Sequence, residues 1–110
     1  MPTLEYIQKL SRQFAEERNW QQYQSPKNLA MAMSVEAAEL VEHFQWLTEE
    51  QSRQLHDEQR QEVSHEIADI LFYLMRIVDV LDIDMQKAID EKSQINEEKY
   101  PLSMSAKKDG

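Results

Sequence analysis

The scarcity of residues that interrupt regular structure constrains this chain more than any other feature. Its 110 residues include one glycine and three prolines, the two residue types that most strongly mark turns and helix ends. Good helix formers such as alanine, leucine, glutamate, glutamine and methionine dominate the sequence. We therefore expect an all-α protein built from a few long helices with short connections.

The length fits a single domain, which we expect over residues 1–101, followed by a flexible polar tail over 102–110. The chain has no cysteine, which excludes disulfides and thiolate metal sites. No apolar run approaches the roughly 20 residues needed to cross a bilayer, and the first residues lack the regions of a signal peptide. We expect a soluble cytoplasmic protein with no membrane partner.

The formal net charge of −9 opposes binding to the phosphate backbone of a nucleic acid. A nucleotide ligand would need local cations to neutralise its phosphates. Because the chain is rich in carboxylates, a bound divalent metal is the simplest source of that positive charge.

Apolar residues at helical spacing predict four long helices. Their approximate ranges are 4–18, 26–46, 58–81, and a last helix that begins after Asp82 or Asp84 and ends before Pro101. The first should have Thr3 as its N-cap and bury a stripe made of Leu4, Ile7, Leu10 and Phe14. Thr48 and Gln51 fit a capping box that opens a short connecting helix. The prediction is a four-helix bundle with one short connecting helix.

The second and third long helices have further signals. Ser25 suits an N-cap position and Pro26 the first helical position. The range 58–81 is apolar nearly all round, and such a helix is buried on more than one side. In so small a protein this indicates a helix–helix interface between subunits, and hence a homo-oligomer.

Two pairs of acidic residues repeat one spacing. Glu36 and Glu39 lie three residues apart in the second helix, and Glu66 and Asp69 do so in the third. Each pair therefore projects from one helix face, and four carboxylates converge if the two helices pack together. Like charges repel and desolvation is costly, whereas a divalent cation resolves both problems. Oxygen-only ligands favour Mg²⁺ or Mn²⁺ over Zn²⁺.

Other interpretations stay open at this point. In a helical chain with 21 acidic residues, such pairs also arise by chance on solvated faces. Glu62-x-x-His65 partly matches the ligand motif of di-iron bundles, but these need a second copy of the motif, which the sequence lacks. A non-catalytic helical oligomerisation or nucleotide-binding module, whose acids are structural, is the alternative to an enzyme.

The ordered set of motifs resembles the MazG-like, all-α nucleoside triphosphate pyrophosphohydrolases, and in particular their compact dCTP-pyrophosphatase branch. The resemblance rests on Glu36-x-x-Glu39 and Glu66-x-x-Asp69 together with flanking segments. These segments are Glu17-Arg18-Asn19-Trp20, Pro26-Lys27-Asn28-Leu29, Phe44-Gln45-Trp46, Asp69-Ile70-Leu71-Phe72-Tyr73-Leu74 and the stretch from Lys92 through Asn96 to Lys99-Tyr100-Pro101.

The resemblance implies an activity and a set of roles. The four acids would form the catalytic site and hold Mg²⁺, and a nucleoside triphosphate would be cut into a monophosphate and pyrophosphate in the removal of surplus or noncanonical deoxynucleotides. The implied phosphate-binding residues are Lys27, Asn28, Lys92, Asn96 and Lys99. The implied base-binding aromatics are Trp20, Trp46 and Tyr73.

Relatives of this kind form dimers or tetramers with active sites near subunit interfaces. Some dCTP-hydrolysing relatives carry histidine at the position of Ser11, so the nucleobase preference stays open. Arg76 shares a helix face with Asp69 and Tyr73, and pairing with an acid is the simplest expectation for it.

Overall fold

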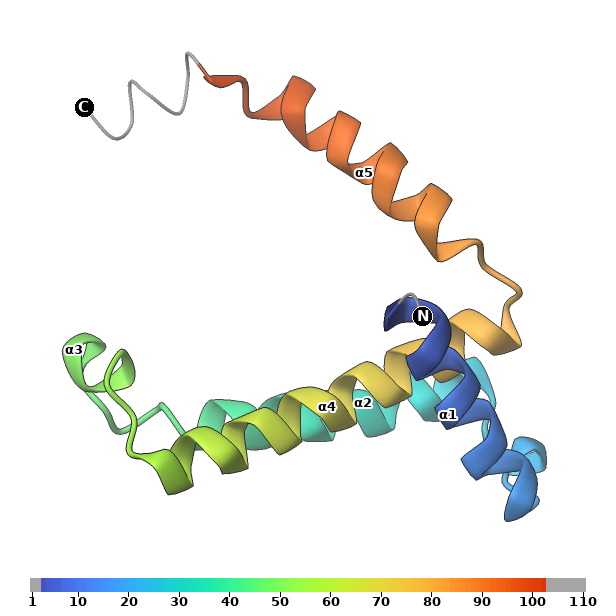
Figure 1. Cartoon of the computed structure of the whole chain (residues 1–110), viewed down its shortest axis with the longest axis horizontal. Coiled ribbons are helices and arrows are strands. Elements are labelled where there is room, and N and C mark those ends of the chain that lie inside the picture. Colours follow the sequence, from blue (N-terminus) through green and yellow to red (C-terminus); the bar gives the residue numbers. More distant parts are fainter. Residues whose placement is uncertain (1–2, 103–110) are drawn as a thin grey trace.

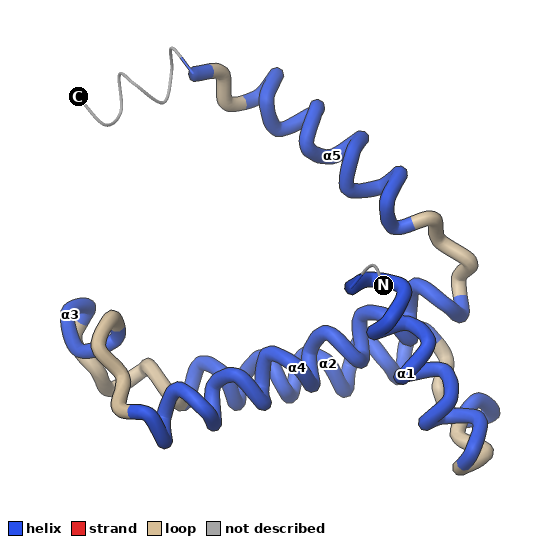
Figure 2. The backbone as a smooth tube through the Cα atoms, viewed as in Figure 1, coloured by secondary structure: helices blue, strands red, loops and turns tan. Residues whose placement is uncertain are grey.

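The computed structural model describes residues 3–102, and every regular element in that range is helical (Figure 2). The elements in order are α1 (Thr3–Glu17), the 3₁₀ turn η1 (Gln21–Tyr23), α2 (Pro26–Glu42), α3 (Glu49–Ser52), α4 (Asp57–Val80) and α5 (Met85–Lys99). The predicted all-α class is confirmed, as are the four long helices and the short connecting helix.

The longest helix, α4, organises the molecule. In Figure 1, α2 runs alongside α4, and α1 crosses α4 near its C-terminal end. The apolar core is small, and its buried members are Ala15 on α1, Leu29 on α2 and Val63, Met75 and Val78 on α4. The packing of α2 along α4 is what places the acidic residues of the two helices near one another.

Two predicted helix starts are confirmed in detail. The Ser25 hydroxyl accepts a hydrogen bond of 3.1 Å from the Asn28 backbone N–H, and Pro26 occupies the first helical position of α2. At α3, the Thr48 hydroxyl accepts from the Gln51 N–H at 3.1 Å, and the Gln51 side chain accepts from the Thr48 N–H at 2.9 Å. These bonds satisfy backbone donors that have no partner within the helix.

The turn between α4 and α5 settles which aspartate caps the last helix. Asp84 does so, because its carboxylate accepts a hydrogen bond of 3.1 Å from the Lys87 N–H. Asp82 instead takes a left-handed backbone conformation with φ of 53°, which aspartate tolerates better than most residues.

Two predicted helix ends are wrong by a few residues. Thr3 is already helical and is not the N-cap of α1. Helix α2 ends at Glu42 and not at Trp46, because the chain tightens into i→i−3 turns such as the Phe44 N–H to Val41 carbonyl bond of 2.9 Å. Such tightening is common in the last turn of a helix.

The predicted buried stripe of α1 is wrong in its larger members. Leu10 is 37% exposed and Phe14 is 49% exposed, whereas Ser11 and Ala15 are buried. Small residues allow α1 to approach α4 closely, so the helix turns Ser11 and Ala15 toward its neighbour. Leu10 and Phe14 line an adjacent cavity instead.

The four long helices do not form one bundle within a single chain, which corrects the expected arrangement. Helix α5 extends away from α1, α2 and α4 (Figure 1), and its Ile89 and Ile95 are 39% and 51% exposed. The helix has few apolar positions, so it cannot cover a large core by itself. Helix α4 also leaves apolar side chains such as Ile67 and Leu71 exposed, and their burial against a second subunit stays a prediction.

The predicted flexible tail falls almost wholly on residues 103–110, outside the described residues. Within residues 3–102, none of the helices combines the length and the apolar character that crossing a bilayer requires.

Candidate functional site

Three carboxylates from two helices meet beside the α2–α4 interface. Glu36 and Glu39 come from α2 and Glu66 from α4, and each offers one oxygen within 4.8 Å of the oxygens of the other two. All three side chains are half-buried. The i, i+3 spacing puts the first two on one face of α2, and the packing of α4 brings the third against them.

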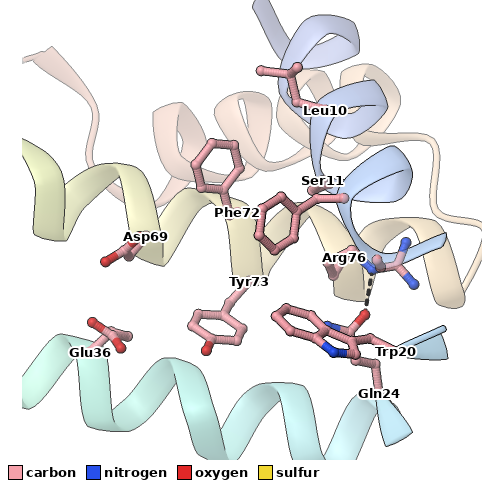
Figure 3. Close-up of a pocket in the computed structure, with 11 residues that line it drawn as sticks. Leu10, Ser11, Trp20, Gln24, Glu36, Asp69, Phe72, Tyr73 and Arg76 are labelled. Carbon is pink, nitrogen blue, oxygen red and sulfur yellow. Dashed lines mark hydrogen bonds between the residues drawn. The ribbon is translucent and has the colours of Figure 1, made fainter. Parts of the chain in front are cut away.

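Asp69, the fourth predicted acid, lies one turn along α4 from Glu66 and is more exposed. Figure 3 shows its carboxylate and that of Glu36 on opposite sides of the space between α4 and α2. Both residues line the same cavity. The structure therefore brings the four predicted acids to one region, with three of them in the tightest group.

Within residues 3–102, no positively charged side chain pairs with the three clustered carboxylates. Burial raises the pKa of Glu36, with a further rise from its hydrogen bond with Glu66. A hydrogen bond with Glu36 and the charge of Glu36 raise the pKa of Glu39. The Oε2 atom of Glu66 is buried and has no hydrogen-bond partner among residues 3–102.

A hard divalent cation fits this group of acids. The donors are all carboxylate oxygens, the type of ligand that Mg²⁺ and Mn²⁺ take. The unpartnered buried oxygen of Glu66 carries the desolvation cost of a charge without the compensation of a partner. A bound cation would supply that compensation and would lower the raised pKa values of Glu36 and Glu39.

A cavity of about 650 Å³ opens beside the acids. It is lined by residues of α1, α2 and α4 and of the segment between α1 and α2, namely Leu10, Ser11, Phe14, Ala15, Trp20, Gln24, Glu36, Asp69, Phe72, Tyr73 and Arg76. Figure 3 shows Glu36 and Asp69 at one end and Trp20 at the other, with Tyr73 between them. The cavity is therefore acidic at one end and aromatic at the other.

The aromatic end is held by contacts among its own residues. Phe14 and Trp20 meet edge to face, with ring centroids 5.3 Å apart and an interplanar angle of 63°, an arrangement that their quadrupoles favour. The guanidinium of Arg18 lies 3.5 Å from the centroid of the Phe14 ring. Flat rings fixed in this way offer a stacking surface to a planar ligand.

Tyr73 joins the two ends of the cavity. It lies one turn beyond Asp69 on α4, and its ring lies between Glu36 and Trp20 (Figure 3). Burial raises the pKa of its phenol above the ordinary value of 10.0, and the nearby charges of Glu36 and Asp69 add to the rise. The phenol therefore keeps its proton at neutral pH and can donate a hydrogen bond.

Arg76 lines the cavity and is held by a network of hydrogen bonds. The side chain is 5% exposed, and its Nη1 donates to Asp79 Oδ2 at 2.9 Å, which confirms the expected pairing with an acid. Its Nε donates to Gln24 Oε1 at 2.8 Å. Asp79 also accepts from Gln8 at 3.2 Å and from Arg12, and the Arg12 hydrogen bond holds the pKa of Asp79 below its usual range.

Comparison with known proteins places this arrangement in a family. Residues 31–109 match the MazG-like family. The chain belongs to the MazG-like family.

Individual relatives agree with that assignment. The chain is 36% identical over 106 residues to dCTP pyrophosphatase 1 of Mus musculus and 35% identical to that of Homo sapiens. Each match covers 94% of this chain and 62% of the mammalian protein, so the chain spans less than two thirds of those proteins. A crystal structure of a pyrophosphatase from Archaeoglobus fulgidus DSM 4304 superimposes with a TM-score of 0.83 at 38% identity, covering 92% of this chain and 94% of the archaeal one.

Several residues predicted for this MazG-like site do not reach the cavity within one chain. Trp46 is 87% exposed and lies outside the cavity lining. Lys27 and Asn28 are exposed at the start of α2, where the Asn28 amide donates to the Tyr23 carbonyl at 3.0 Å. Their predicted roles in base and phosphate binding therefore stay predictions.

The α5 residues predicted to bind phosphate are also remote from the cavity. Lys92, Asn96 and Lys99 are exposed on the helix that extends away from the rest of the chain (Figure 1). A phosphate-binding role for them would require a second copy of the MazG-like chain to bring its α5 to the acids.

The sequence did not predict several residues that line the cavity of this MazG-like chain, among them Leu10, Phe14, Phe72 and Gln24. Phe14 was assigned to the core because it shares the apolar spacing of α1. Phe72 adjoins Tyr73, and Gln24 directly precedes the strong N-cap Ser25. The sequence did offer a signal for Gln24, because it lies between the aromatic segment that contains Trp20 and the N-cap of α2.

Proposed function

We propose that this MazG-like chain is a Mg²⁺-dependent nucleoside triphosphate pyrophosphohydrolase, with deoxynucleotides such as dCTP or noncanonical relatives as substrates. The observation that carries the proposal is the cavity, which is lined by Glu36 of the carboxylate cluster and by Asp69 at one end and by aromatic rings at the other. A nucleotide has the matching construction, with a planar base at one end and a triphosphate, which binds metal, at the other.

The aromatic end would hold the nucleobase. Stacking on an aromatic side chain contributes about 1–3 kcal/mol per base, and Trp20 and Phe14 form a stable T-shaped pair there. Tyr73 lies nearer the acids, where the sugar would pass. Trp46 would join this pocket only if a second subunit contributed it.

The acidic end would hold the metal. Glu36, Glu39, Glu66 and Asp69 are the residues that would bind Mg²⁺, with Mn²⁺ as a possible substitute. A bound divalent ion polarises and orients a phosphoryl group and lowers the pKa of a bound water. The buried, unpartnered oxygen of Glu66 supports this role because it has no other source of compensation among the described residues.

The reaction needs one water for each nucleotide. The water oxygen bonds to phosphorus, a P–O bond of the α–β anhydride bridge breaks, and the monophosphate and pyrophosphate leave. A carboxylate of the cluster accepts the proton that the water gives up. The aromatic cavity holds the base and thereby fixes the anhydride against the acids, which lowers the entropic cost of reaching the transition state.

The relatives support the substrate class. Proteins named dCTP pyrophosphatase 1 match this chain over 94% of its length. A role in removing surplus or noncanonical deoxynucleotides in the cytoplasm, and assembly as a homo-oligomer through the exposed apolar side of α4, belong to the same proposal.

The test is pyrophosphate release from a panel of dNTPs and NTPs, each with Mg²⁺ or with EDTA. The proposal expects metal-dependent release with a preference among bases. Release without base preference would remove the role given to the aromatic end. No release from any nucleotide would favour the alternative, a helical oligomerisation or nucleotide-binding module whose acids are structural.

A further inference from the structure

Gln24 lies at the aromatic end of the cavity, in the segment between η1 and α2. Its side chain is half-buried and lines the cavity together with Trp20 and Arg76 (Figure 3). The roles assigned above to stacking rings and acids leave this amide unused. An amide among aromatic side chains can form a hydrogen bond with polar atoms on the edge of a planar ligand.

The orientation of the Gln24 amide is fixed by its partner. Arg76 Nε donates to Gln24 Oε1 at 2.8 Å, and a guanidinium has donors only. The reverse orientation of the amide would point its NH₂ group at another donor. Gln24 therefore presents its oxygen to Arg76 and keeps its nitrogen for another partner.

Arg76 is itself held in place. It is 5% exposed, and Asp79 accepts from its Nη1 at 2.9 Å. Asp79 is held in turn by Gln8, at 3.2 Å, and by Arg12 on α1. A guanidinium anchored on both sides in this way gives the Gln24 amide a rigid support, because two of its nitrogens already have partners in place.

The Gln24 Nε2 group makes no hydrogen bond to the part of the chain that the structure describes, residues 3–102. It is a donor on a residue that lines the cavity together with Trp20. Resting on the proposed function, we propose that Gln24 is a specificity-determining residue that donates a hydrogen bond to an acceptor on the edge of the stacked nucleobase. Arg76 and Asp79 act as positioning residues for it.

Different bases place their acceptors differently, since cytosine, uracil, adenine and guanine carry distinct patterns of carbonyl oxygens and ring nitrogens. A single fixed donor therefore favours some bases over others. Gln24→Glu is the sharpest test, because one oxygen of the new carboxylate still accepts from Arg76 while the other puts a charged acceptor in place of the donor. Gln21→Glu is the matched control, since Gln21 is an exposed η1 residue outside the cavity lining and gains the same charge.

The experiment measures kcat/KM for dCTP, dUTP, dATP and dGTP with the wild-type chain and both variants, and the melting temperature of each. We expect Gln24→Glu to change the ratios of kcat/KM between nucleotides by about tenfold, which is the effect of losing one hydrogen bond to the base. Gln21→Glu should leave these ratios unchanged. Gln24→Met, which lacks both the donor and the Oε1 acceptor of Arg76, should bring the four kcat/KM values closer together instead of favouring a different base.

An equal loss on all four nucleotides, or no loss, with an unchanged melting temperature would overturn the inference. It would leave the proposed function intact, because the wild-type chain would still release pyrophosphate. Absence of release by the wild-type chain from all four would overturn the proposed function and the inference together.

Discussion

Glu36 on α2 and Glu66 on α4 bring carboxylate oxygens within 4.8 Å of each other, with no ion pair to either among residues 3–102. The pKa of Glu36 is raised by burial and by Glu66, because a nearby like charge disfavours the ionised form. The helix packing thus maintains an unfavourable electrostatic arrangement. Such arrangements are typical of functional sites.

Removing one charge from the cluster should stabilise the metal-free protein. Glu66→Gln replaces a half-buried carboxylate with a neutral amide of similar size, which can donate to Glu36. In EDTA we expect its melting temperature to exceed that of the wild type by a few degrees, about the effect of 1 kcal/mol in a small domain. In Mg²⁺ with nucleotide the order should reverse, because a ligand that binds only the folded state stabilises it. A wild-type melting temperature that is indifferent to Mg²⁺ and nucleotide would contradict the metal site.

The ion-pair network at Asp79 should make stability depend on acid pH. Its pKa is lowered below the ordinary 3.8, mainly by the Arg12 hydrogen bond, so its contribution is present above that value and is lost as pH falls through the folded-state pKa. Asp79→Asn should lower the free energy of unfolding at pH 7 by about 1–3 kcal/mol, because buried Arg76 loses a charged partner. Urea denaturation from pH 7 to pH 3 should show the gap between the two proteins narrowing. A constant gap would mean that the charge of Asp79 is unimportant.

The raised pKa values of Glu36 and Glu39 make stability depend on pH in the opposite direction to that of Asp79. A carboxyl with a raised pKa binds its proton more tightly in the folded state, so acidification through that pKa stabilises the fold. The free energy of unfolding of the wild type should therefore rise as the pH falls from 7 toward the ordinary glutamate pKa of 4.5. Glu36→Gln should lack this gain. Glu62→Gln, an exposed α4 residue outside the cluster, should retain that gain.

Loss of a stacking ring should weaken nucleotide binding without changing the metal chemistry. Trp20→Ala should raise KM by about tenfold or more, from the 1–3 kcal/mol of a base–aromatic contact, while leaving the Mg²⁺ requirement intact. Tyr23→Ala is the control, since Tyr23 is 66% exposed and outside the cavity lining. Equal effects of the two substitutions would argue against a base site at Trp20.

The lysines of α5 test whether the site is shared between copies of the chain. Lys92 belongs to α5, which extends away from the helices that carry the acids (Figure 1), so a phosphate-binding role requires a neighbour. Lys92→Ala should then raise KM, whereas Lys87→Ala, which loses only an exposed pair with Glu91 at 3.9 Å, should not. Mixing the Lys92→Ala and Glu39→Gln proteins should restore some wild-type sites. Unchanged kinetics in Lys92→Ala would remove α5 from the site.

The sequence predicted the local structure well because its determinants are local. Ser25 and Thr48 cap helices through hydrogen bonds within three residues of themselves, and the apolar spacing of α4 is unmistakable. The acidic pairs were also readable, since the i, i+3 spacing fixes them on one face. Glu36 and Glu66 then needed only the packing of two helices to meet.

The positions of side chains and helices in the folded chain could not be predicted in the same way. Phe14 has the spacing of a core residue, yet it is 49% exposed and lines the cavity, because small residues of α1 form the contact with α4. The direction of α5 depends on the short turn after α4. The helix has too few apolar residues for the sequence to indicate which surface it packs against. The orientation of the Gln24 amide depends on a hydrogen bond from Arg76, which lies 52 residues away in the chain.

The most direct test of the central claim is pyrophosphate release from dCTP by the wild-type chain and by Glu39→Gln, each with Mg²⁺ and with EDTA. Helix content is checked by circular dichroism. The account predicts release by the wild type in Mg²⁺, none in EDTA, and loss of turnover in Glu39→Gln with its helices intact, because the substitution removes a ligand charge with little change in volume. Full activity of Glu39→Gln, or release by the wild type in EDTA, would contradict it.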